Sequence, residues 1–162
     1  MSIQIITIAC LSIGLSSALV AGVFQAFSEF VMKALIQAKP ASGVDAMQMI
    51  NRTVFKTVFL VLLIGLTPVT AAFAIYAYFN IASPATTWII AGAVIYVIGV
   101  FLVTMRGNVP MNERLDKMDN DSAETFIYWT EYGTVWTRWN HVRMLGSLAT
   151  AICFIIAGVL MS

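Results

Sequence analysis

The stretch VFKTVFLVLLIGLTPVTAAFAIYAYF, residues 54–79, carries a single charged side chain, that of Lys56. A helix needs about 20 consecutive apolar residues to cross the hydrocarbon core of a bilayer, so this run is long enough to span a membrane. Three more runs, residues 3–24, 86–105 and 142–161, approach or exceed that length. We therefore expect an all-α integral membrane protein with four spans at about these positions.

Composition points to the same class. Of 162 residues, 60% are hydrophobic and 10% are charged, whereas a soluble domain carries about 25% charged residues. Four spans use most of the chain, so we expect residues 1–162 to form one domain, a four-helix bundle. The net charge of +1 gives no basic excess of the kind that a nucleic-acid-binding surface needs.

The basic residues predict an orientation. All nine lie around the first or third connection between spans: Lys33, Lys39, Arg52, Lys56, Arg106, Arg114, Lys117, Arg138 and Arg143. By the positive-inside rule, both connections face the cytoplasm and both termini lie outside it, as in a bacterial inner-membrane protein. A cleaved signal peptide is the alternative interpretation of residues 3–24, but no basic residue precedes Ile3.

Two spans are expected to extend beyond the bilayer on the cytoplasmic side. The first apolar segment continues past Phe24 to AKPASG, residues 38–43, where Pro40 and Gly43 act as helix breakers. The second helix is expected to begin near Ser42 or Asp45 and to continue without a break into residues 54–79. Helices one and two therefore form an antiparallel pair of cytoplasmic extensions.

The third connection is the longest, RGNVPMNERLDKMDNDSAETFIYWTEYGTVWTRWN, residues 106–140. Pro110 suits the first turn of a short helix that ends near Met118. The sequence DSAE, residues 121–124, is typical of a helix start in which Asp121 or Ser122 accepts backbone N–H groups. We expect an amphipathic helix to run from there into the fourth span.

Several amides lie close to the membrane boundary. Gln25, Gln48, Asn51 and Asn140 all fall within about two helical turns of a predicted span end, where polar groups are costly unless they are paired. They either hold the helices together or line a pocket. Aromatic and polar residues in the last segment follow helical spacing on one face: Trp129, Tyr132, Trp136, Trp139 or Asn140, and Arg143. An interfacial anchor belt is the alternative for the tryptophans.

Metal chemistry fits the composition poorly. A zinc or iron site usually draws several ligands from His, Cys and carboxylate side chains, but the chain has one histidine and two cysteines. Cys10 and Cys153 are predicted in the outer halves of the first and last helices, as free thiols that behave as small apolar residues, with a disulfide as the alternative. We expect no metal and no cofactor; a haem with His141 as single axial ligand is the alternative.

Four motifs resemble the anthrone oxygenase-like family of small membrane proteins. They are FSEFVMKAL (residues 27–35), AMQMIN (46–51), NVPMNERLD (108–116) and WNHVR (139–143), in this order among four hydrophobic segments. The characterised members are cofactor-free oxygenases that oxidise polycyclic anthrones to anthraquinones. The positions that match the family motifs are Asn51, Asn108, Pro110, Asn112, Trp139, Asn140 and Arg143.

This resemblance implies an apolar slot with a base for proton removal and donors for a developing oxyanion. The expected base is His141 or Glu29, since His and Glu side chains commonly act as general bases, and the expected donors are Asn140, Asn112 and Arg143. The expected substrate contacts are Trp136, Trp139, Gln48, Asn51, Asn108 and Gln25.

The function predicted from the sequence is oxidation of membrane-partitioned, anthrone-like aromatic substrates. A non-enzymatic membrane protein that binds a lipid, a quinone or a partner membrane subunit is the alternative. A small transporter is a third possibility, although no internal repeat is visible. In each case the partner is an apolar small molecule or another membrane component, with homo-oligomerisation open.

The orientation can be tested with reporter fusions. A reporter after Ser162 should report the outer compartment, and one inserted near Asn120 should report the cytoplasm, because all the basic residues lie on the first and third connections. Paired alkaline phosphatase and fluorescent protein fusions measure this directly. The same compartment for both sites would contradict a four-span topology.

Overall fold

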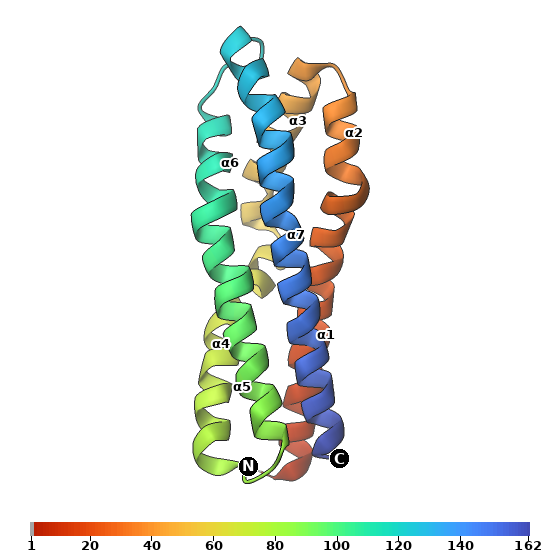
Figure 1. The fold of residues 1–162 in the computed structure, drawn as a ribbon, viewed down its shortest axis with the longest axis vertical. Coiled ribbons are helices and arrows are strands. Elements are labelled where there is room, and N and C mark those ends of the chain that lie inside the picture. Colours follow the sequence, from red (N-terminus) through yellow and green to blue (C-terminus); the bar gives the residue numbers. More distant parts are fainter. Residues whose placement is uncertain (1) are drawn as a thin grey trace.

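The computed structural model describes residues 2–162, and every regular element in that range is a helix. Four helices are long and apolar enough to cross a membrane: Ile3–Gln37, Val58–Asn80, Ala85–Asp116 and Ala123–Leu160. They lie side by side along the long axis of the molecule (Figure 1). The expected all-α membrane fold is therefore confirmed, although several element boundaries differ from those expected.

The first long helix combines α1 (Ile3–Ala26), a π-helical turn η1 (Phe27–Val31) and α2 (Met32–Gln37). It ends before Pro40, which takes the first position of α3 (Pro40–Thr53), where its missing N–H costs nothing. The antiparallel pair of helix extensions is therefore present.

Gly43 lies inside α3 and does not break it, so that part of the expectation was wrong. A Cβ atom at Gly43 would collide with the backbone oxygen of Leu35. The glycine is thus needed for the close approach of α3 to α2, and the turn between them falls at Ala38 and Lys39.

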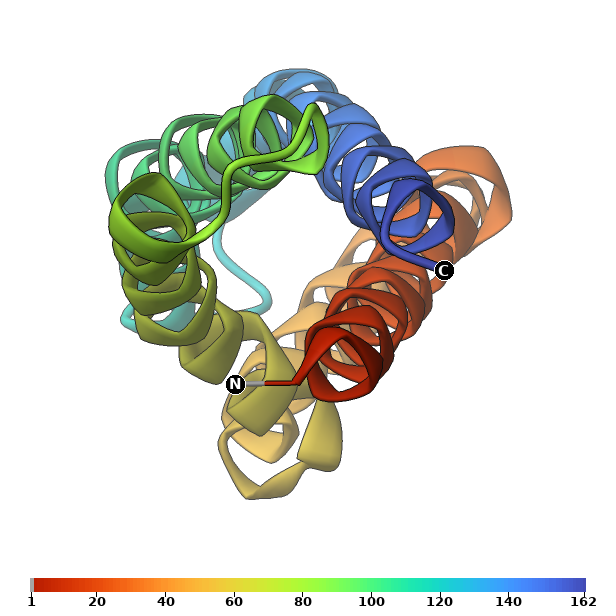
Figure 2. The same cartoon turned by 90° about the horizontal axis from the view of Figure 1, so that it is seen from below.

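The second helix is broken at the membrane boundary, where we expected it to be continuous. A 3-10 turn, η2 (Val54–Lys56), is followed by extended backbone at Thr57, with φ −111° and ψ 151°, before α4 (Val58–Asn80) begins. The Thr57 hydroxyl accepts a hydrogen bond from the backbone N–H of Leu60 at 3.4 Å, which satisfies one of the donors that a helix start leaves unpaired. The segment between α3 and α4 bulges outward from the ring of helices in Figure 2.

The third long helix continues much further than the sequence suggested. It runs through α5 (Ala85–Ile95), the π-helical turns η3 (Tyr96–Leu102) and η4 (Thr104–Asn108), and α6 (Val109–Asp116). The short helix expected from Pro110 is present, because Pro110 lies in the first turn of α6, which ends at Asp116. It follows directly on the π-helical turn η4 and so extends the third long helix.

The last connection is consequently short, covering residues 117–122, and α7 (Ala123–Leu160) is one continuous helix. The Ser122 hydroxyl accepts a hydrogen bond from the backbone N–H of Thr125 at 3.2 Å. The helix start predicted at DSAE is therefore confirmed, with Ser122 as the capping residue.

The helices form a closed ring in which α1 contacts α7 and α4, and α5 contacts α7 and α4 (Figure 2). Both termini lie at one end, and α2, α3, α6 and the first turns of α7 lie at the other (Figure 1). The core at the end distant from the termini is rich in aromatic and methionine side chains, namely Met32, Val44, Met47, Leu115, Tyr128, Trp129, Tyr132 and Trp136. Cys10 and Cys153 are buried free thiols.

Glycines also allow close packing between the long helices. A Cβ at Gly14 of α1 would lie 2.9 Å from Ile155 of α7, so the first and last helices pack closely there. Gly146 of α7 instead faces Gly99 of η3. The second small-residue contact thus joins the third and fourth long helices.

Replacing Gly14 with Leu should lower the free energy of unfolding by about 1–3 kcal/mol, because the added side chain overpacks the contact with Ile155. Gly22→Leu is the matched control on the same helix, since a Cβ at Gly22 meets nothing within 4 Å. Thermal unfolding in detergent measures both. Equal stability of the two variants would contradict this packing.

Candidate functional site

A cavity of about 450 Å³ lies where α3 meets α4, enclosed by α1, η1, α3, α4, η4, α6 and α7. Its volume falls in the range of roughly 300–1,000 Å³ that small-molecule sites occupy. Most of the walls are apolar, and the aromatic side chains among them are Phe24, Phe27, Phe55, Phe59 and Trp136. The polar atoms that face this space decide what it can bind.

Arg143 is the buried cation of the cavity. Its side chain is only 6% exposed, and its guanidinium lies 4.3 Å from the ring centre of Phe24 and 5.3 Å from that of Trp136. Within residues 2–162 no carboxylate pairs with Arg143; the ion pair found there joins Arg52 and Asp116. A buried charge without a partner is costly, so this position suits an anionic ligand.

Asn140 fixes Arg143 in place. Its Oδ1 accepts a hydrogen bond of 2.7 Å from Arg143 Nη2, and its Nδ2 donates to the backbone oxygen of Phe24 at 2.7 Å and to Ser28 Oγ at 2.8 Å. Both amide hydrogens are therefore used, across the boundary of α1 and η1. Asn140 is positioned to orient the guanidinium and has no N–H left for a ligand, in contrast to the donor role expected from the sequence.

Asn112 is held in one orientation by two donors on α7. Its Oδ1 accepts hydrogen bonds from the Tyr132 hydroxyl and from Trp136 Nε1, each at 2.7 Å. Because an indole nitrogen can only donate, the amide oxygen must be the atom that faces α7. The Nδ2 group of Asn112 is left on the other side of the amide, and Asn112 lines the cavity.

Two more asparagines bring unpaired polar atoms to the cavity. Asn51 Nδ2 and Asn108 Oδ1 are buried without a hydrogen-bond partner, as is Arg143 Nε, and all three residues line the cavity. Asn108 also donates from Nδ2 to the backbone oxygen of Trp136 at 3.1 Å. Most buried polar atoms in proteins are paired, and four more unpaired ones lie elsewhere in the described residues, in Ser17, Thr67, Trp129 and Ser147. The three residues at the cavity supply the polar part of its lining.

Three residues expected at the site are used elsewhere. Gln48 Nε2 donates to the backbone oxygens of Leu115 and Met118, both at 2.9 Å, which satisfies carbonyl groups at the end of α6. Gln25 and Glu29 are joined to each other on an exposed face, with Gln25 Nε2 donating to Glu29 Oε1 at 2.9 Å. None of the three lines the cavity.

His141 and Trp139 also lie outside the cavity. His141 is exposed, and its Nδ1 lies 2.6 Å from the backbone oxygen of Thr137. Trp139 is 41% exposed and packs over Gly107, where a Cβ would lie 2.8 Å from the indole ring. Successive helical residues are 100° apart, so the inward direction of Asn140 turns its two neighbours away.

The cavity contains acidic residues that were not expected at the site. Glu113 and Asp116 of α6 line it, and Asp116 Oδ1 accepts a 2.7 Å ion-pair hydrogen bond from Arg52 Nε. The sequence contained a pattern that indicates part of this lining. Four polar residues, Thr104, Asn108, Asn112 and Asp116, recur every fourth residue and thus share a helix face. Because residues 106–140 were expected to form a long connection outside the third span, this continuous face was missed.

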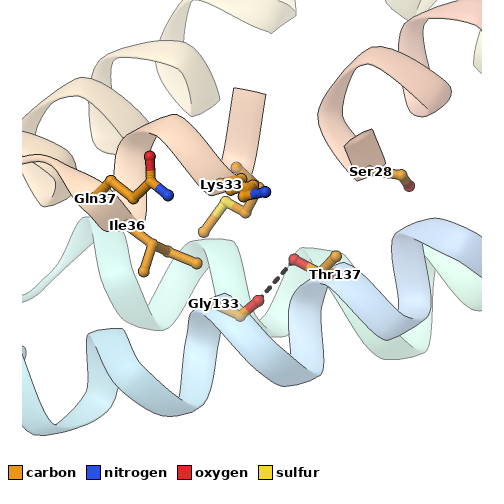
Figure 3. A pocket seen from close by; sticks show the side chains of 7 residues that line it. Ser28, Lys33, Ile36, Gln37, Gly133 and Thr137 are labelled. Carbon is orange, nitrogen blue, oxygen red and sulfur yellow. Dashed lines mark hydrogen bonds between the residues drawn. The ribbon is translucent and has the colours of Figure 1, made fainter. Parts of the chain in front are cut away.

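A second, smaller hollow of about 240 Å³ lies between α2 and α7. Figure 3 shows the labelled side chains Ser28, Lys33, Ile36, Gln37, Gly133 and Thr137 around it. The Thr137 hydroxyl donates back to the Gly133 backbone oxygen at 2.7 Å. Gly133 matters for packing here, since a Cβ on it would lie 2.5 Å from Ile36 Cδ1.

Residues 52–153 match the family model described as Anthrone oxygenase. The chain belongs to this family. No curated protein and no solved structure matches the chain. The matched range includes Asn108, Asn112, Asn140 and Arg143, so most of the polar lining lies within the family region, while α1 and most of α3 lie before it. In the part of the chain that the structure describes, no three His, Cys, Asp or Glu side chains gather as metal ligands do.

Replacing Asn112 with Leu should lower the free energy of unfolding by roughly 2 kcal/mol or more, because Tyr132 and Trp136 each lose the acceptor for a hydrogen bond. Gln25→Ala, on an exposed face, is the control and should change stability by less than about 0.5 kcal/mol. Tryptophan fluorescence during unfolding in detergent reports both. An unchanged midpoint for Asn112→Leu would contradict the hydrogen-bond geometry.

Proposed function

We propose that this protein is a cofactor-free oxygenase of membrane-partitioned polycyclic aromatic substrates of the anthrone type. The observation that carries the proposal is Arg143, a buried guanidinium without a carboxylate partner, flanked by two aromatic rings in an apolar cavity. Such a site fits a flat apolar molecule that becomes an anion during the reaction. Membership of the anthrone oxygenase family supports the same substrate class.

The chemistry needs proton removal and an electron acceptor. An anthrone loses a proton from the methylene carbon opposite its ketone, and the electron pair delocalises onto the ketone oxygen. The methylene carbon of this anion then forms a bond to molecular oxygen, and protonation gives a hydroperoxide. Loss of the second proton from that carbon forms a new ketone while the O–O bond breaks and water leaves. One oxygen atom enters the quinone and the other enters water.

Arg143 would stabilise the anion through its N–H groups. Asn140 and the rings of Phe24 and Trp136 hold the guanidinium in place before substrate binds, so no reorganisation is needed when the negative charge develops. A preorganised donor in a water-poor site contributes about 10²–10³-fold to rate. The unpaired Nδ2 of Asn51 is a second candidate donor to the substrate's oxygen atoms.

The cavity also suits delivery of substrate from the bilayer. Four of its lining residues, Val23, Phe55, Ile64 and Met105, are exposed on the outside of the helices. At the depth of a membrane span, such a surface contacts lipid. A polycyclic substrate dissolved among the acyl chains therefore has a route to the cavity that does not cross water.

Arg143→Met should reduce the rate of oxygen uptake with dithranol, a 1,8-dihydroxyanthrone, by about 100-fold or more once non-enzymatic autoxidation is subtracted. Arg138→Met, at an exposed position of the same helix, is the control and should keep the wild-type rate. An oxygen electrode measures the rate in detergent or nanodiscs, and size-exclusion chromatography shows that each variant is folded.

Two outcomes would contradict the proposal. If Arg143→Met oxidised dithranol as fast as the wild type, Arg143 would have no part in stabilising the anion. If the wild-type protein bound hydroxyanthraquinones but never accelerated oxygen uptake by any anthrone, the cavity would serve the alternative function, the binding of a quinone or lipid without catalysis.

A further inference from the structure

We propose that Glu113 is the catalytic base that removes the proton from the substrate; this inference rests on the proposed oxygenase function. Four ionisable side chains line the cavity: Arg52, Glu113, Asp116 and Arg143. Neither arginine can act as a base, because a guanidinium stays protonated in proteins. The choice is therefore between the two carboxylates of α6.

The two carboxylates differ in their partners. Asp116 Oδ1 accepts a 2.7 Å hydrogen bond from Arg52 Nε, so it is already engaged by a cation. Among the described residues, no ion pair or side-chain hydrogen bond engages Glu113. Glu113 is also exposed, which allows solvent to remove or return its proton between turnovers. Its carboxylate is thus the available proton acceptor of the cavity.

The backbone around Glu113 is well fixed. The preceding residue, Asn112, is bonded to both Tyr132 and Trp136 of α7, and the Tyr128 hydroxyl donates to the backbone oxygen of Met111 at 3.3 Å. These hydrogen bonds hold α6 against α7. A general base needs such support, because it must come within about 3 Å of the proton or act through one water.

The cation and the carboxylate come from different helices, as the substrate requires. In an anthrone, the ketone oxygen and the acidic methylene lie across the central ring from each other, so one residue cannot serve both. Arg143 of α7 and Glu113 of α6 both line the same cavity. Arg143 would bind the ketone oxygen while Glu113 faces the methylene.

The proton transfers balance with Glu113 acting twice. The carboxylate first takes a methylene proton, and the C–H electron pair moves into the ring system and onto the ketone oxygen. After the carbon has bonded to oxygen, the carboxylic acid returns this proton to the peroxide anion. The carboxylate then takes the second proton from the same carbon as the carbonyl forms and the O–O bond breaks. That proton goes to the departing hydroxide, so both methylene hydrogens end in water.

Proton removal can be measured without oxidation. In D₂O without oxygen, the wild-type protein in detergent should catalyse exchange of the methylene hydrogens of dithranol for deuterium, followed by mass spectrometry. Glu113→Gln should lower the exchange rate above the protein-free background by about 10²-fold or more. Glu131→Gln, an exposed carboxylate of α7, is the control and should exchange as the wild type does.

A second measurement separates a base from a structural residue. At a pH high enough to ionise dithranol without help, oxygen uptake by Glu113→Gln should recover towards the wild-type rate, whereas Arg143→Met should stay slow. If Glu113→Gln does not fold, Glu113→Asp serves in its place, because it keeps the carboxylate but shortens its reach. Glu113→Asp should lower the deuterium exchange rate by about tenfold, and an exchange rate equal to that of the wild type would contradict the role of Glu113.

The outcomes distinguish this inference from the proposed function. Exchange by Glu113→Gln at the wild-type rate would overturn the role of Glu113 while leaving the oxygenase function intact. Exchange by the wild type that is lost in Glu113→Gln, without any oxygen uptake by the wild type, would support Glu113 as a base and overturn the oxygenase function. A wild-type protein that catalyses neither exchange nor oxygen uptake would overturn both.

Discussion

The buried hydrogen bond between Arg143 and Asn140 is the constraint on which the polar end of this structure depends. Asn140 uses its oxygen to hold the guanidinium and its nitrogen to bind the backbone of Phe24 and the hydroxyl of Ser28. The Asn140 side chain thereby joins α7 to the first long helix and holds the guanidinium of Arg143 in the cavity wall. The cation has no carboxylate partner in the described chain, so its burial favours a ligand that carries negative charge.

Room for that ligand comes from irregular helix geometry. The extended backbone at Thr57 breaks the second helix, and π-helical turns interrupt the first and third helices at the same end of the molecule. π-helical turns are frequent at functional sites, and here η1 and η4 both contribute residues to the cavity lining.

The polar lining is divided between support and function. Asn112 and Asn140 are engaged by neighbouring helices and hold α6, α7 and α1 in place. Asn51 and Arg143 keep buried N–H groups unpaired. Unpaired buried donors destabilise a fold. Under the proposed function, these two N–H groups are the ones available to a ligand.

The sequence by itself determined the class of the protein, its four long apolar helices, the capped start of α7 and the family, since these follow from local composition and short motifs. Six residues that the sequence analysis singled out also line the cavity, namely Asn51, Asn108, Asn112, Trp136, Asn140 and Arg143. Only the tertiary structure turned His141 and Trp139 outward, joined Gln25 to Glu29 on an exposed face, and brought Glu113 to the cavity. The physical reason is helix packing: the face of each helix that turns inward depends on contacts with other helices, such as those that Asn140 makes with Phe24 and Ser28. Neighbouring residues, 100° apart on the helix, then face elsewhere.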